Sequence, residues 1–127
     1  MDDFERIIRE SEEILIFAFD ELKEARREQD EMRARQVCEK GYLSLIKAFN
    51  AFFVKRGKKV EELPQGERRR RYFLHTVGGR ELENLYDVMR HRLHIEGFHE
   101  GIIIFDSLEE DLKEISKFVS DLKDGKF

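Results

Sequence analysis

Hydrophobic positions recur along the chain at the three- and four-residue spacing of α-helices, and no stretch alternates with the period of two typical of strands. Gly57, Gly78 and Gly125 mark helix ends between these periodic stretches. The predicted helices cover about 3–28, 30–56, 67–77, 80 to at least 95 (or to 100), and 107 to just before 125. We therefore predict an all-α, up-and-down bundle of four main helices plus one short helix, in one domain over residues 1–127.

Two details of the helices are informative. Ser107-Leu108-Glu109-Glu110 is a capping box, which predicts that the last helix begins there. Gly41 falls in the middle of the second helix, where it costs about 1 kcal/mol relative to Ala. We expect that a neighbouring helix approaches closely at Gly41 and compensates for this cost.

Two segments are more apolar than one face of a bundle requires. Ile14–Phe19 is apolar all the way round the helix, and Ile102–Phe105 is apolar over four consecutive residues. The short helix over 67–77 or the C-terminal tail could cover them. We favour a second copy of the chain as the cover, and so predict a homodimer.

The composition favours a particular location and source for the protein. No apolar run reaches the roughly 18 residues that span a bilayer, and the acidic start is unlike a signal peptide. The single cysteine, Cys38, excludes an internal disulfide and favours a reducing, cytoplasmic location. Only two Asn and three Gln accompany 24 basic and 28 acidic residues, which favours a thermophilic source.

The net charge of −4 conceals an asymmetry along the chain. Residues 1–54 carry 9 basic and 13 acidic side chains, and residues 100–127 carry 4 and 8. Residues 55–99 carry 11 and 7, and they hold all four histidines. This basic middle third favours contact with RNA or a nucleotide, although charge-rich helical surfaces also vary by this amount without a ligand.

The segment over 90–100 holds the strongest candidates for chemistry. On an α-helix, Arg90 precedes His94 by one turn, and Arg92 precedes His99 by two turns, an axial rise of about 10.5 Å. An arginine that holds a phosphate beside a histidine that exchanges a proton near neutral pH suits nucleotide binding or RNA cleavage.

The four arginines of 68–71 form a second candidate, a phosphate-binding patch. Consecutive helical residues point in all directions, so at most two of the four share a surface; we select Arg68 and Arg71, with His75 nearby. The alternative is a solvated helix start paired with Glu61, Glu62 and Glu67.

Metal binding is not expected. Glu96 and His99 have the Glu-x-x-His spacing of helical di-iron sites, but no second copy of that spacing exists. Three histidines within nine residues of one helix, at 91, 94 and 99, cannot converge on one Zn²⁺. We predict no metal and no cofactor.

Two segments resemble the HEPN family (the higher eukaryotes and prokaryotes nucleotide-binding domains). Gln36–Phe52, with its Glu39-Lys40 pair followed by small and apolar residues and closed by Gly57, is similar to the second helix of that family. The segment 92–101 (Arg-Leu-His-Ile-Glu-Gly-Phe-His-Glu-Gly) is similar to the apolar-His-apolar-x-Gly-aromatic signature of its archaeal PaREP-type branch. In helix order and length the resemblance covers about 3–122.

This resemblance implies a dimerising helical bundle with a metal-independent ribonuclease site, Arg-x(4–6)-His, at the dimer cleft. Such proteins are often toxins paired with a nucleotidyltransferase-like antitoxin. Arg92 and His99 meet the spacing, whereas His94 fills the histidine position of the branch signature. The implied function is binding of RNA or a nucleotide, with Arg92 and Arg90 on phosphate and His99 or His94 as general acid or base. The alternative is a non-catalytic interaction module, a partner of a nucleotidyltransferase-like protein.

Overall fold

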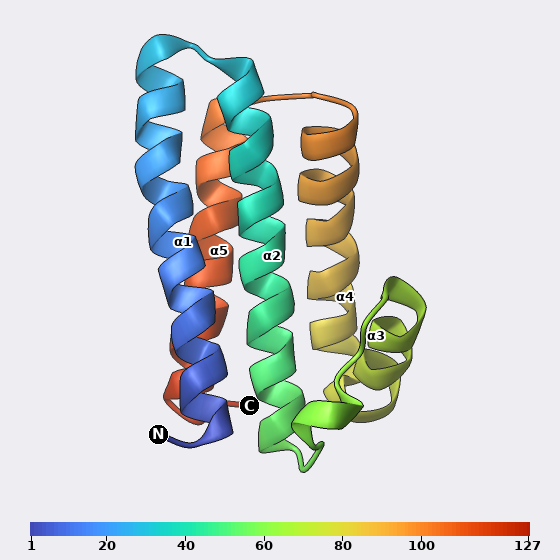
Figure 1. The fold of residues 1–127 in the computed structure, drawn as a ribbon. Helices are drawn as coiled ribbons and strands as arrows, with labels where there is room; N and C mark the ends of the chain where they lie inside the picture. Colours follow the sequence, from blue (N-terminus) through green and yellow to red (C-terminus); the bar gives the residue numbers. More distant parts are fainter.

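The computed structural model describes residues 1–127 and consists of helices without strands. Its elements are α1 (Asp3–Glu28), α2 (Glu31–Lys55), the 3₁₀ turn η1 (Val60–Glu62), α3 (Glu67–Phe73), the π-helical turn η2 (Leu74–Gly78), α4 (Gly79–Met89), the π-helix η3 (Arg90–His99) and α5 (Phe105–Lys123). The rods α1, α2, α4–η3 and α5 run alternately up and down, with α3 beside the lower half of α4 and both termini at one end (Figure 1). The predicted bundle of four main helices and one short helix is confirmed.

The helix starts follow local capping chemistry in α1 and α2. Side-chain oxygens of Asp2 and Asp30 accept hydrogen bonds from backbone N–H groups three residues later, at 2.8 and 3.0 Å. The predicted capping box at 107–110 is wrong, because α5 begins two residues earlier. Ile104 is extended and its carbonyl accepts the N–H of Leu108 at 3.0 Å, which leaves Ser107 inside the first turn.

The core lies around α2, which packs against α1, α5 and η3. The ring of Phe49 lies 5.2 Å from that of Phe118 on α5 and 6.0 Å from that of Tyr86 on α4. Farther down α2, Phe53 meets Phe73 of α3 edge to face at 5.3 Å. Aromatic side chains of one central helix therefore hold three other elements in place.

Glycines allow the closest approaches to α2. A Cβ atom on Gly41 would lie 2.6 Å from Cδ2 of Leu112 on α5, so the expected close approach at this glycine is confirmed. A Cβ atom on Gly97 of η3 would lie 2.5 Å from the Sγ atom of Cys38. Both glycines are buried, and at the seam between η3 and α2 the Gly97 backbone lies directly against the Cys38 side chain, which leaves no room for a side chain at Gly97.

The helix predicted over 80–95 or 80–100 is continuous from Gly79 to His99, but its hydrogen bonding changes at Arg90. The α-register of α4 gives way in η3 to the π-register, in which N–H groups bond five residues back. Its end is held by Arg35 of α2, whose guanidinium donates to the carbonyls of Phe98 and His99 at 2.8–2.9 Å. A side chain of the neighbouring helix thus satisfies carbonyls that the helix leaves open.

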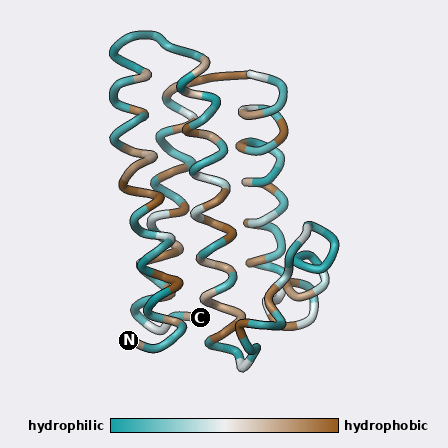
Figure 2. Tube along the Cα trace, viewed as in Figure 1, coloured by the Kyte–Doolittle hydropathy of each residue, from teal (hydrophilic) through white to brown (hydrophobic).

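The two apolar segments singled out above remain partly uncovered in the single chain. Exposed fractions are 63% for Ile16, 50% for Phe17, 50% for Ile102 and 62% for Ile104. Figure 2 shows the connection that carries the last two as a brown stretch at the top of the bundle, far from α3. No helix combines the length and the apolar character needed to cross a membrane.

Gly97→Ala is expected to destabilise the protein by about 1–3 kcal/mol, because the new methyl group overlaps the Cys38 side chain. Urea denaturation of the single variants and of the double variant Gly97→Ala/Cys38→Ala measures this. Removing the sulfur makes room for the methyl group, so Gly97→Ala should cost less in the Cys38→Ala background. An equal cost in both backgrounds would show that the seam is not tight at this pair.

Candidate functional site

His94 of η3 is held against α2 by two contacts. Its Nδ1 atom lies 2.8 Å from Oε1 of Glu39, and its ring stacks on that of Tyr42 at 4.7 Å between centroids. A carboxylate that accepts a hydrogen bond from Nδ1 favours the tautomer whose Nε2 carries a lone pair. The imidazole is therefore oriented by its neighbours, with Nε2 as its acceptor atom.

His99 lies beside His94, with ring centroids 4.6 Å apart and the planes at 79°. Its side chain is exposed. In an α-helix, residues five apart point about 140° away from each other, since each residue turns the helix by 100°. In the π-register they are neighbours on successive turns, and so η3 brings the two imidazoles together. Sequence reasoning missed this pair because it assumed α-register throughout.

Arg92 points to the other flank of η3. Its Nε atom lies 3.0 Å from Oδ2 of Asp111 on α5, and the Asp111 side chain is only 8% exposed. The hydrogen bond to Asp111 raises the pKa of Arg92. Burial raises the pKa of Asp111, although Arg92 acts on it in the opposite direction. The guanidinium of Arg92 is thus already paired with a carboxylate of its own chain.

The expectation that Arg92 and His99 share one side of the helix is not met. The buried seam of Leu93 and Gly97 separates the flank of Arg92, which faces α5, from the flank of His94 and His99, which faces α2. The physical reason is again the π-register, in which seven residues no longer make two turns. Of the three residues predicted as catalytic, the fold joins His94 to His99 and leaves Arg92 apart.

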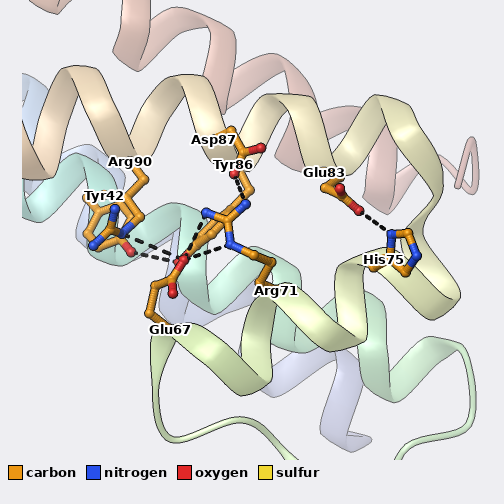
Figure 3. A network of polar contacts seen from close by, with 8 residues as sticks. All are labelled: Tyr42, Glu67, Arg71, His75, Glu83, Tyr86, Asp87 and Arg90. Atoms are coloured by element: carbon orange, nitrogen blue, oxygen red, sulfur yellow. Dashed lines mark hydrogen bonds and ion pairs between the residues drawn. The ribbon is translucent and has the colours of Figure 1, made fainter.

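A network of arginines, carboxylates and tyrosines continues from Tyr42 toward α3 (Figure 3). Glu67 of α3 accepts hydrogen bonds from Arg71 at 2.9–3.0 Å and lies 4.0 Å from the Nε atom of Arg90. Arg71 also pairs with Asp87 at 2.5 Å. Behind these pairs the hydroxyl oxygens of Tyr42 and Tyr86 lie 3.2 Å apart, with both residues buried. We refer to this set as the arginine–tyrosine network.

The four residues predicted to bind phosphate have different surroundings in this region. Arg90 lies beside Tyr42 at the junction of α4 and η3, with its side chain 32% exposed. The guanidinium of Arg71 is occupied by two carboxylates. His75 pairs with Glu83 at 3.1 Å near the start of α4, away from Arg90, and Arg68 points to solvent on α3. Of these four residues, Arg90 is the one that lies beside Tyr42, whose ring stacks on His94.

Arg70 was not singled out from the sequence, yet it is the buried member of the 68–71 run. It is 8% exposed, and its Nε atom is buried without a hydrogen-bond partner. The sequence held a signal, since Arg70 precedes the buried Phe73 by three residues and so shares its face of α3. Because positions 68–71 are all arginine, the residue types alone do not show which of the four is buried.

No protein-family model, curated protein or solved structure matches this chain. The chemistry of the site therefore has to be argued from its own residues. No group of three or more His, Cys, Asp or Glu side chains is arranged to hold a metal ion.

Asp111→Asn is expected to alter how stability depends on pH. Because the pKa of Asp111 is raised in the folded state, the folded chain binds this proton more tightly than the unfolded chain. The stability that this group contributes therefore declines as pH rises from about 4, the ordinary carboxyl pKa, through the raised value. Urea denaturation across this range should show the wild type losing stability relative to Asp111→Asn. A difference that stays constant with pH would contradict the assignment.

Proposed function

We propose that the protein binds RNA by its phosphate backbone and cleaves it by metal-independent acid–base chemistry at His94 and His99. The observation that carries this proposal is the contact of two imidazoles, one backed by Glu39 and the other open to solvent. Two such groups at one place can serve as base and acid in the same reaction. The positively charged middle third and the HEPN resemblance of residues 36–52 and 92–101 support RNA as the substrate.

The proposed reaction uses His94 as the base. Its Nε2 lone pair takes the proton of a ribose 2′-hydroxyl, whose oxygen attacks the adjacent phosphorus. Protonated His99 donates its proton to the departing 5′-oxygen, which leaves a 2′,3′-cyclic phosphate and a free 5′-hydroxyl. We assign neutralisation of the phosphate to Arg90, and its position beside the Tyr42 ring that stacks on His94 supports this role. In this mechanism Arg90 alone keeps the phosphate-binding role expected of Arg92 and Arg90, because Asp111 already balances the charge of Arg92.

A second property, self-association, is favoured by the exposed isoleucines and Phe17. Ile102 and Ile104 lie in the connection after η3 and line one pocket with Arg92 and Asp111, so a partner seated on them would lie next to Arg92. We propose that a second copy of the chain covers this surface and that the active form is a homodimer. A nucleotidyltransferase-like antitoxin is the protein that we expect to compete for the same surface.

His94→Ala and His99→Ala are each expected to lower the rate of RNA cleavage by about 100-fold or more, since each removes one proton-transfer group. A fluorescently labelled RNA in buffer containing EDTA provides the assay, with product ends identified as cyclic phosphate.

The matched control is His91→Ala, which removes an exposed imidazole of the same helix that pairs only with Glu96. It should leave the rate unchanged. Equal activity of all three variants and the wild type would exclude the acid–base role, and RNA binding without cleavage would favour the interaction module.

Ile102→Glu is expected to shift a dimer toward monomer in sedimentation velocity at micromolar concentration, because a charge replaces an apolar contact. Val88→Glu is the control, since Val88 is 49% exposed, close to the 50% of Ile102, but lies on α4. A wild-type protein that sediments as a monomer would overturn the homodimer.

A further inference from the structure

The arginine–tyrosine network and the neighbouring Arg70 of α3 contain hydrogen-bond donors that have no acceptor. The Nε atoms of Arg70 and Arg90 are both buried and without a hydrogen-bond partner. Unsatisfied buried donors are rare in proteins, and a guanidinium left unpaired is among the most unfavourable. Two such donors lie on neighbouring elements, α3 and the start of η3. One acceptor that serves both would explain why neither has a partner within the chain.

The tyrosine pair adds a third free donor. Two hydroxyl groups carry two protons, and the contact between Tyr42 and Tyr86 uses only one of them. Burial raises the pKa of Tyr42, and the bond to Tyr86 raises it further, so the hydroxyl remains protonated. Arg70 and Arg90 act on the same pKa in the opposite direction, and Figure 3 shows Arg90 beside Tyr42.

The carboxylates of the network do not meet this demand. Glu67 receives both of its short contacts from Arg71, and Asp87 also pairs with Arg71. The Nε atom of Arg90 lies 4.0 Å from Glu67, beyond hydrogen-bonding distance. Three arginines, Arg70, Arg71 and Arg90, face two carboxylates, so one positive charge has no counterpart.

One acceptor on α2 is also buried without a partner, Oδ1 of Asn50. It follows Tyr42 by eight residues, a rise of about 12 Å along the helix. A neutral amide oxygen at that distance serves neither the Tyr42 hydroxyl nor the uncompensated charge.

We propose that Arg70, Arg90 and the Tyr42–Tyr86 hydroxyl pair form a binding site for a single phosphate group. An oxyanion with several acceptor oxygens satisfies all three donors and supplies the missing negative charge. On the solvent side the site is bordered by Arg90 and Arg71, whose side chains are 32% and 42% exposed. The site deepens the proposed function by naming where a phosphate next to His94 is held, but its occupancy does not require cleavage.

The test measures thermal stability against the concentration of inorganic phosphate, and of AMP in a second arm. A ligand that binds only the folded state raises Tm with its concentration. Sodium chloride at matched ionic strength is the control for screening and should not reproduce the increase. The AMP arm distinguishes a phosphate monoester on a nucleoside from the free ion.

Arg90→Gln is the main variant, because the Arg90 side chain is 32% exposed and can be changed without leaving a large cavity. We expect the apparent Kd for phosphate to rise by about tenfold or more, the loss of one charge-assisted contact. Arg70→Gln should remove the phosphate-dependent increase as well. Arg68→Gln makes the same charge change on the exposed side of α3 and should leave the increase intact.

His99→Ala separates this proposal from the proposed function, since it should abolish cleavage and retain the phosphate-dependent rise in Tm. An equal rise in the wild type and Arg90→Gln, or a rise that sodium chloride reproduces, would overturn the phosphate site. Either result would leave acid–base chemistry at His94 and His99 to be judged on its own assay.

Discussion

The close contact between α2 and η3 at Gly97 is the constraint on which the rest of the site depends. Gly97 lies against the Cys38 side chain, and Gly41 lies against leucine side chains of η3 and α5, so neither glycine position has room for a side chain of its own. Glu39 and Tyr42 follow Cys38 and Gly41 by one residue each, and because the helices are so close both side chains contact His94. Arg35 reaches the last carbonyls of η3 for the same reason. Both the orientation of the histidine and the end of the helix are thus set by packing.

The π-register of η3 decides which residues of the histidine-bearing segment meet. It places His94 and His99 on one flank and Arg92 on the other, where Asp111 neutralises it. Extended π-helices are rare, and departures from α-register are frequent at functional sites. Here the departure has a definite chemical consequence, since it assembles two imidazoles that α-register would hold apart.

Charge is distributed unevenly around this seam. Arg92 and Arg71 are paired with carboxylates, whereas Arg70 is buried with none. Partnered arginines stabilise the contacts between helices, and an unpartnered one in the same region is informative because burying it is unfavourable. The basic middle third identified from the sequence thus divides into arginines that pair with carboxylates and arginines that lack such a partner.

The sequence by itself determined the four long helices and the short one, because their apolar periodicity is strong and two of their starts carry aspartate caps. It also predicted the close approach at Gly41, the exposure of two apolar segments and the basic, histidine-rich middle third. Only the tertiary structure decided the start of α5, the π-register of η3 and the burial of Arg70. These features depend on what another helix places opposite a residue, such as Cys38 against Gly97, and periodicity along one chain contains no information about the opposing surface.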